Sequence, residues 1–303
     1  MTRILSPAKL NLFLYVTGKR DDGYHTLCSL MTCIDLYDEL DLTVGGGKGI
    51  RVRCDNPGVP EDASNLVHRA AVLFRERLRS LNPGMDPFPG LNIVIHKTIP
   101  VGAGLGGGSS NAACVLKALN RINGNPFSRN ELMSMGLTLG ADVPFFIHGG
   151  PALARGIGEE LTECGPLRPY HVLVVYPGIA ASTALVYKNV DLGLTNIGKS
   201  NNNPLLNLCG EGRELDVKGL LHNDLETAAC RLYPEIESVK RKMTGILSDG
   251  VLMTGSGSSF FVLFSEQDQA ELAFMALQGW EMAGKQLFLT SFAAVCKQGQ
   301  CEK

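Results

Sequence analysis

A run of glycines constrains this chain most strongly. Glycine occupies five of the seven positions from Gly102 to Gly108, within the longer segment Pro100–Ser110. Glycine tolerates positive φ and lets backbone N–H groups approach an anion closely. Apolar residues at helical spacing come next and predict a helix over 109–123 that ends at Gly124: Ala112, Val115, Leu116, Leu119 and Ile122. Because a helix start adds N–H donors and partial positive charge, the segment predicts a phosphate-binding loop rather than a flexible linker.

Two other glycine patterns compete with this interpretation. Gly193–Ser200 matches the Walker A motif letter for letter, but three asparagines and Pro204 follow it where the motif needs a helix, which favours a solvated loop. Gly102–Gly107 also fits the dinucleotide fingerprint G-x-G-x-x-G, after a strand expected at 91–95. A second helix at 128–139 follows, however, where a Rossmann unit needs another parallel strand with an acidic residue. A nicotinamide or flavin site is therefore not expected.

The composition narrows the class of protein. The 303 residues allow about two domains. Lys and Arg total 28 against 30 Asp and Glu, so the net charge of −2 disfavours nucleic acid or an anionic membrane as the main partner. Nine cysteines without a C-x-x-C pair suggest buried thiols in a reducing compartment.

The sequence also predicts a soluble, cytoplasmic protein. The amino terminus lacks the apolar core of a signal peptide. Pro177-Gly178 splits the longest uncharged stretch, 169–187, so no membrane span is expected. Five histidines show no metal-ligand spacing and are assigned to structure: His68, His96, His148, His171 and His222.

Strands and helices are expected in a mixed order. Strands are predicted at 8–16, 27–44, 91–95, 145–148 and 172–176, with a hairpin over 251–264 around Gly255-Ser256-Gly257. Helices are predicted at 66–78, 109–123, 128–139, 224–233, 234–243 and 267–283, with caps at Ser64 or Asn65, at Ser128 with Glu131, and at Ser265. Because no regular βαβ alternation is present, the pattern favours an α+β fold.

The glycine segment makes the chain recognisable. Pro100–Ser110 resembles the phosphate loop of the GHMP small-molecule kinases, and Met253–Gly257 resembles their third glycine motif. Ser6–Leu12, followed by Gly18-x-Arg20-x-Asp22-Gly23-Tyr24-His25, is similar to the amino-terminal signature of one branch of this family. Gly140–Phe146 is similar to the catalytic segment of that branch. The resemblance covers nearly the whole chain, although Ser258-Ser259 and a long loop at 191–215 depart from the family pattern.

The resemblance implies a fold and a reaction. The fold is two-lobed, with an ATP-binding lobe at 1–160, a substrate-side lobe at 161–303 and the active site in the cleft between them. The reaction transfers the γ-phosphoryl group of ATP to the 2-hydroxyl, a tertiary alcohol, of a methylerythritol that carries CDP, in the non-mevalonate isoprenoid pathway. Mg²⁺ is expected with ATP and held by phosphate oxygens, since no carboxylate cluster or other protein metal site is visible. No oligomeric state is predicted.

Phosphoryl transfer needs charge neutralisation, in-line positioning and removal of the hydroxyl proton. By resemblance, Asp142 is the base and Lys9 the activating cation; read alone, Asp142 could be a turn residue and Lys9 a surface lysine on an edge strand. The implied ATP-binding residues are Pro100, Val101, Gly102, Ala103, Gly104, Leu105, Gly106, Gly107, Gly108, Ser109, Ser110, Asn65 and Lys97. The implied substrate-binding residues are Asn11, Tyr24, His25, Thr183 and Tyr187, the last four forming a cytidine pocket.

Two alternatives stay open at this point. Another kinase of the same superfamily could act on homoserine or mevalonate, in which case Tyr24 and His25 would meet no cytidine. A non-catalytic nucleotide-binding or regulatory protein could keep the glycine loop, but the presence of both Lys9 and Asp142 disfavours it.

Overall fold

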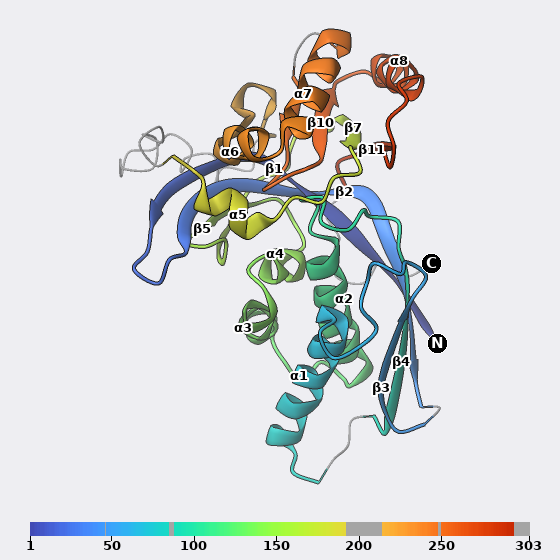
Figure 1. The fold of residues 1–303 in the computed structure, drawn as a ribbon. Helices are drawn as coiled ribbons and strands as arrows, with labels where there is room; N and C mark the ends of the chain where they lie inside the picture. Colours follow the sequence, from blue (N-terminus) through green and yellow to red (C-terminus); the bar gives the residue numbers. More distant parts are fainter. Residues whose placement is uncertain (46, 85–87, 192–213, 248–249, 294–303) are drawn as a thin grey trace.

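Two long antiparallel strands run through the middle of the molecule (Figure 1). The computed structural model describes residues 1–45, 47–84, 88–191, 214–247 and 250–293. Strand β1 (Thr2–Lys19) pairs with β2 (His25–Val44) along nearly its whole length. Within the described ranges they belong to a seven-stranded sheet of order β3-β4-β2-β1-β8, with β5 on β2 and β6 on β5. The added strands are β3 (Gly49–Cys54), β4 (Gly90–His96), β5 (Ala152–Arg155), β6 (Glu160–Glu163) and β8 (His222–Asn223).

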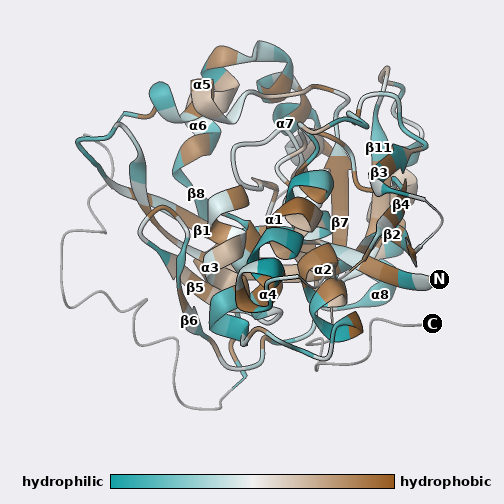
Figure 2. Cartoon of the chain, turned by 90° about the horizontal axis from the view of Figure 1, so that it is seen from below, coloured by the Kyte–Doolittle hydropathy of each residue, from teal (hydrophilic) through white to brown (hydrophobic). Residues whose placement is uncertain are grey.

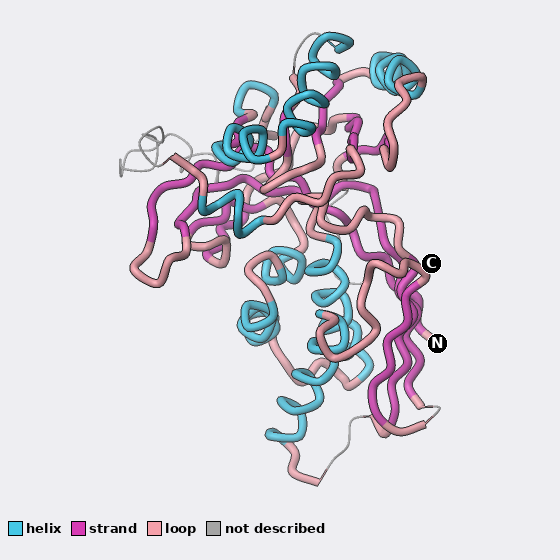
Figure 3. Tube along the Cα trace, in the orientation of Figure 1, coloured by secondary structure: helices cyan, strands magenta, loops and turns pink. Residues whose placement is uncertain are grey.

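A second sheet and two groups of helices complete the fold. The second sheet has the order β11-β7-β10-β9, from β7 (His171–Tyr176), β9 (Leu252–Met253), β10 (Phe260–Phe264) and β11 (Gln286–Ser291). Helices α1 (Leu66–Leu81), α2 (Gly107–Ile122), α3 (Arg129–Leu139) and α4 (Val143–His148) lie on one side of the long strands (Figures 1 and 3). On the other side lie α6 (Asp224–Leu232), α7 (Pro234–Leu247) and α8 (Gln267–Gln278), while α5 (Thr183–Lys188) lies next to the strands and η3 (Lys218–Leu220) is a short 3₁₀ turn.

Strand β1 is buried on both faces because it contributes to three apolar cores in succession. Ile4 belongs to the core under α1–α4, Leu10 and Phe13 to the core between the two sheets, and Val16 to the core under α6–α8. A register shift between Asn11 and Phe13 redirects the side chains at the middle of the strand. In Figure 2, β7 is almost wholly hydrophobic, whereas α1 alternates between hydrophobic and hydrophilic residues. A polar side chain at the middle of β1 therefore faces protein, not bulk water.

The α+β fold and most of the expected elements are confirmed. The strands expected at 8–16, 27–44, 91–95 and 172–176 lie within or along β1, β2, β4 and β7, and the hairpin over 251–264 is β9 paired with β10. Helix α3 has the expected capping box of Ser128 and Glu131, and α1 is capped by Asn65. The short strands β3, β5, β6, β8 and β11 and helix α5 were not assigned from the sequence, because two to six residues carry little periodic signal.

Three local predictions were wrong. Residues 145–148 form part of helix α4 rather than a strand, because Pro144 occupies the first helical turn and an apolar run buried all round shows no period. The N-cap position of helix α8 is Glu266, not Ser265, and no side chain caps it; the helix ends at Gln278 rather than near 283. Helix α2 begins at Gly107, two residues before the expected start, so that Gly107 and Gly108 lie in its first turn.

The described cysteines include both thiols and a disulfide-bonded residue. Cys28, Cys54 and Cys230 are thiols as expected, whereas Cys164 is disulfide-bonded, which the expectation of scattered thiols did not include. No helix within the described ranges is long and apolar enough to cross a membrane. The Walker-like segment Gly193–Ser200 lies outside the described residues.

Candidate active site

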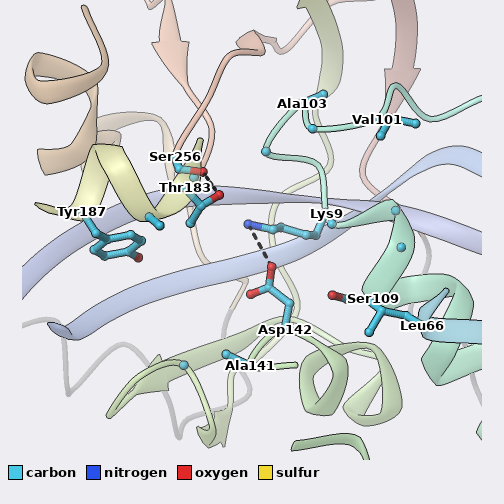
Figure 4. A pocket seen from close by; sticks show the side chains of 18 of the residues that line it. Lys9, Leu66, Val101, Ala103, Ser109, Ala141, Asp142, Thr183, Tyr187 and Ser256 are labelled. Atoms are coloured by element: carbon cyan, nitrogen blue, oxygen red, sulfur yellow. Dashed lines mark hydrogen bonds and ion pairs between the residues drawn. The ribbon is translucent and has the colours of Figure 1, made fainter. Parts of the chain in front are cut away.

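A cavity of about 1150 Å³ opens where the two halves of the fold meet (Figure 4). Its walls come from β1, from the glycine segment that leads into α2, from the residues before α4, from α5 and from the third glycine segment. Most of the side chains that the sequence singled out line it together: Lys9, Asn11, Tyr24, His25, Asn65, Lys97, Ser109, Asp142, Thr183 and Tyr187. The cavity thus joins residues from nearly the whole length of the chain.

Lys9 lies at the centre of this cavity and is almost fully buried, with 4% of its surface exposed. Its ammonium donates a hydrogen bond to Asn11 Oδ1 and lies 3.9 Å from Asp142 Oδ2. Asn11 Nδ2 donates to Ser29 Oγ at 2.7 Å, and Ser29 Oγ donates to the carbonyl of Phe13 at 2.7 Å. This chain of donors turns the amide oxygen of Asn11 toward Lys9. The N–H of Lys9 donates to the carbonyl of Leu105 and the side chain is buried, so Lys9 is not a surface lysine on an open strand edge.

Asp142 is held by the start of helix α4 but keeps its carboxylate available. It is the N-cap residue of α4, yet its side chain makes no capping hydrogen bond, and the side chain is 40% exposed. Figure 4 shows the carboxylate directed at the Lys9 ammonium across the cavity. A turn-forming role through a side-chain hydrogen bond therefore has no support in this geometry.

The glycine segment has the backbone conformation that the sequence predicted. Gly102, Gly104 and Gly106 have φ values of 68°, 79° and 72°. A Cβ at Gly106 would lie 2.9 Å from Phe146 and 3.0 Å from Lys9 Cγ, so no larger residue fits there without movement. Gly106 is the N-cap of α2, and the residues of the first turn, Gly107 to Ser109, line the cavity. Because the first N–H groups of a helix lack intrahelical acceptors, this turn can receive an anionic oxygen.

Asn65 and Lys97 line the far end of the cavity, but their polar groups have partners within the protein. Lys97 Nζ pairs with Asp38 Oδ2 at 2.7 Å and donates to the carbonyl of Ile99, and Asp38 is fully buried. Asn65 Oδ1 caps α1 by accepting from Val67 N at 2.8 Å, while its Nδ2 donates to the carbonyl of Pro60 at 2.6 Å. Both side chains thereby shape the cavity wall.

The opposite end of the cavity is aromatic. The ring centroids of His25 and Tyr187 lie 5.6 Å apart, and Tyr24 is 62% exposed at the rim. Thr183 Oγ1 and Ser256 Oγ share a hydrogen bond of 2.7 Å. Burial, and then the nearby Lys19 ammonium, lower the pKa of His25, so its imidazole is neutral at pH 7. Burial, and then the charge of Asp142, raise the pKa of Tyr187, so its phenol keeps its proton.

Two residues of the predicted ATP-binding set do not line the cavity. Leu105 packs into the core between the sheets, although its carbonyl accepts a hydrogen bond of 2.9 Å from Lys9 N. Ser110 is buried, and its Oγ accepts from Ser6 Oγ at 2.7 Å. The first turn of α2 directs the side chain of Ser110 toward Ser6 and away from the cavity.

Several lining residues had no role in the sequence analysis, and the polar and glycine positions among them include Gly255, Ser256 and Asn111. Gly255 and Ser256 belong to the third glycine motif, which was noted without a role. Asn111, one turn after Gly107 on α2, is buried and lines the cavity, and its Oδ1 accepts no hydrogen bond within the described part of the protein. Helical spacing from Gly107 was the signal that could have found it. No group of three or more His, Cys, Asp or Glu side chains within the described ranges could hold a metal ion.

This fold, with a glycine loop at a helix start facing a buried lysine and an aspartate, defines a small-molecule kinase. Residues 65–150 match the family described as GHMP kinases N terminal domain, and residues 205–279 match GHMP kinases C terminal. The 4-diphosphocytidyl-2-C-methyl-D-erythritol kinase of Syntrophotalea carbinolica is 44% identical over 90% of this chain and 93% of that protein. The kinase of the same name from Bacillus pumilus is 39% identical over 91% of this chain and 92% of that protein.

Solved structures agree with these relatives. A crystal structure of 4-(cytidine 5'-diphospho)-2C-methyl-D-erythritol kinase is 36% identical, covers 96% of this chain and 100% of that chain, and superposes with a TM-score of 0.75. The homoserine kinase of Cytophaga hutchinsonii, 19% identical with a TM-score of 0.66, covers 97% of this chain and 94% of its own and shares the fold. The chain belongs to the family of 4-diphosphocytidyl-2-C-methyl-D-erythritol kinases.

Proposed function

We propose that the cavity binds ATP and a CDP-bearing methylerythritol together and transfers the γ-phosphoryl group to the 2-hydroxyl of the methylerythritol. The observation that carries this assignment is the position of the Lys9–Asp142 pair. It lies between the first turn of α2, which suits phosphates, and the aromatic end of the cavity, which suits a base. A hydroxyl that reaches this pair from the aromatic end faces a phosphate bound at the helix start.

The phosphoryl transfer is a single displacement at the γ-phosphorus. The hydroxyl oxygen forms a bond to the γ-phosphorus while the bond from that phosphorus to the β,γ-bridging oxygen breaks, and ADP leaves. The hydroxyl proton passes to the Asp142 carboxylate, which acts as general base. The Lys9 ammonium offsets the negative charge that develops on the attacking oxygen, and Asn11 holds that ammonium in place.

The binding roles follow the two ends of the cavity. Gly106, Gly107, Gly108 and Ser109 offer N–H groups to the β- and γ-phosphates, and Asn65 and Lys97 shape the adenine end. Tyr24, His25, Thr183 and Tyr187 receive the cytidine. Mg²⁺ that arrives with ATP would be held by the phosphate oxygens, which suit this cation. It would supply additional neutralisation of phosphate charge.

The division into two lobes is also a proposal. We place the boundary near residue 160, with 1–160 as the ATP-binding lobe and 161–303 as the substrate-side lobe. The family matches at 65–150 and 205–279 support this division. Tyr24 and His25 precede the boundary, so the first lobe contributes to the cytidine end as well. The cytoplasmic location expected from the sequence stays a prediction.

One assay separates this function from its rivals. ADP release is measured with the cytidine diphosphate substrate and, in parallel, with free methylerythritol phosphate, homoserine and mevalonate. We expect turnover with the cytidine substrate to exceed turnover with the other three by at least ~10³-fold, because a site built for hydrogen-bonded recognition rejects compounds that lack the partner groups. Faster turnover of homoserine or mevalonate would reassign the substrate and leave the kinase class intact. No turnover of any of them would favour a binding protein.

A further inference from the structure

The start of helix α6 holds the third glycine segment, residues 253–257, in place. Asn223 is the N-cap of α6 and is 6% exposed. Its Nδ2 donates to the carbonyl of Met253 at 2.7 Å and to the carbonyl of Gly255 at 2.8 Å, the two carbonyls that flank Thr254. Its Oδ1 accepts from Leu225 N at 2.9 Å and so caps the helix. Every hydrogen-bonding group of this amide is used.

Glu226, in the first turn of the same helix, adds a third connection to the segment. Its Oε2 accepts from Met253 N at 2.8 Å, and its Oε1 pairs with the Lys240 ammonium. The Glu226 side chain is largely buried, while the Lys240 side chain reaches the surface. The first turn of α6 and its N-cap residue thus hydrogen-bond to the segment at the N–H of Met253 and at the carbonyls of Met253 and Gly255.

Residues 253–257 pack directly on Lys9 and Asn11. Thr254 Oγ1 accepts from Asn11 N at 3.0 Å. A Cβ at Gly255 would lie 3.2 Å from Lys9 Nζ, from Asn11 Oδ1 and from the carbonyl of Gly104. The phosphate loop touches it as well, because a Cβ at Gly104 would lie 2.4 Å from the carbonyl of Thr254. A displacement of this segment therefore displaces Lys9, Asn11 and the glycine loop together.

We propose that Asn223 is a positioning residue for phosphoryl transfer, acting through residues 253–257 on the Lys9 ammonium. Serine, threonine and aspartate cap helices about as well as asparagine, but none of them offers an NH₂ group with two donors beside the capping oxygen. The site needs both functions at one position, which explains an asparagine there. This inference rests on the proposed role of Lys9, and Asn223 touches no substrate.

The test replaces the donors and keeps the cap. Asn223→Asp preserves the side-chain shape and the capping oxygen but sets an oxygen against two carbonyls. Asn223→Ser also keeps a cap and removes both donors without adding charge. We expect kcat to fall by ~10- to 100-fold in both variants, while KM for ATP and for the cytidine substrate changes by less than about threefold. Small misplacements of a catalytic group act on the reaction step rather than on binding.

The chain offers a matched control at Asn120. This asparagine is also 6% exposed, and its amide likewise holds a loop: Nδ2 donates to the carbonyl of Phe127 at 2.9 Å, and Oδ1 accepts from Phe127 N at 3.0 Å. It lies near the far end of α2 and does not line the cavity. Asn120→Asp should lower the melting temperature about as much as Asn223→Asp and change kcat by less than about twofold. If the two variants lose kcat equally, Asn223 is only structural and the proposal is overturned.

A double-mutant cycle identifies the route. In a Lys9→Ala background, Asn223→Asp should cost less than about threefold in kcat, because its effect passes through the missing ammonium. Two full losses that multiply would overturn the proposed route. If Lys9→Ala lowers kcat while Asn223→Asp does not, the inference fails and the proposed function stands. If Lys9→Ala leaves kcat unchanged, the proposed role of Lys9 fails first, and this inference falls with it.

Discussion

The ammonium of Lys9 lies 3.9 Å from the carboxylate of Asp142, although one residue belongs to the central strand β1 and the other to the turn before α4. The strand supplies a buried cation, and the helix start supplies a carboxylate open to the cavity. Because the two groups belong to different layers of the fold, their separation depends on how α2 packs on β1 and on how α4 packs on α2. The role of each side chain can therefore be tested by a single substitution that leaves the helices and strands unchanged.

Asp142→Asn keeps the shape of the side chain and removes the proton acceptor. We expect kcat to fall by ~10²- to 10⁴-fold, the usual value of general-base assistance, while both ligands still bind. Steady-state kinetics together with calorimetric titration of each ligand measure the two effects separately. Turnover near the wild-type rate would mean that Asp142 only supports the loop.

Lys9→Ala is the companion to that variant. It should act on the same chemical step, so the double variant should lose less than the product of the two single losses. Independent, multiplying losses would show that Lys9 and Asp142 serve different steps.

Gly106→Val tests the choice of phosphate loop. Its φ of 72° and the contacts that a Cβ would make with Phe146 and Lys9 leave no room for a β-branched residue. We expect KM for ATP to rise at least ~10-fold, since such strain costs ~1–3 kcal/mol. Lys199→Ala, in the Walker-like segment outside the described residues, serves as the control and should leave turnover nearly unchanged. If Lys199→Ala abolished turnover while Gly106→Val did not, the phosphate loop would be the Walker-like segment instead of residues 100–110. Gly107→Val should also weaken ATP binding, but for a different reason: Gly107 is helical, and a side chain there would crowd Lys97 and Ile99.

Tyr24→Ala tests the cytidine end. Stacking of a base on an aromatic side chain is worth ~1–3 kcal/mol, so the Kd of the cytidine substrate should rise by ~10-fold, while the Kd of ATP stays within about twofold. Because Tyr24 is 62% exposed, the change should have little effect on stability. Isothermal titration calorimetry with each ligand provides the comparison. Equal weakening of both ligands would indicate a general disturbance of the fold.

Lys97→Met tests whether this lysine serves mainly as the partner of Asp38. Both side chains are almost wholly buried, and removing one member of such a pair leaves a charge without its partner. We expect the free energy of unfolding to fall by ~3–5 kcal/mol in urea titrations. Asp38→Asn in the Lys97→Met background should restore part of that loss, because it removes the isolated charge. No loss of stability, combined with weaker ATP binding, would make Lys97 a direct ligand of the nucleotide.

His148 predicts a pH dependence of stability. Burial first, and then the neighbouring Arg129 guanidinium, lower the pKa of this imidazole below its ordinary value of about 6.5. Between the lowered value and the ordinary one, the unfolded chain binds a proton that the folded protein does not. The free energy of unfolding therefore falls as the pH drops through this window. In urea titrations at pH 7.5 and pH 5.5, His148→Gln should reduce the difference between the two values. An unchanged difference would assign the dependence to other groups.

The sequence by itself determined the elements with strong local signals. Five glycines before an apolar helical stripe indicated α2 and the positive-φ backbone that leads into it. Ser128 with Glu131 indicated the start of α3, because backbone conformation and capping are local properties. Residues 145–148 were mistaken for a strand because a short run buried on all sides has no period, so only its packing beneath α2 and α3 reveals the helix.

Tertiary structure alone decided which of the named residues meet. No spacing in the chain shows that Asp38 neutralises Lys97, that Ser110 turns to Ser6, or that Asn223 holds the loop next to Lys9. Asp38 and Lys97 are 59 residues apart in the sequence, and Ser6 and Ser110 are 104 residues apart. Such contacts form only when both sheets and the helices enclose β1 from two sides. Local chemistry selected the residue types; burial of the strand between three apolar cores decided that Lys9 became a shielded cation facing Asp142.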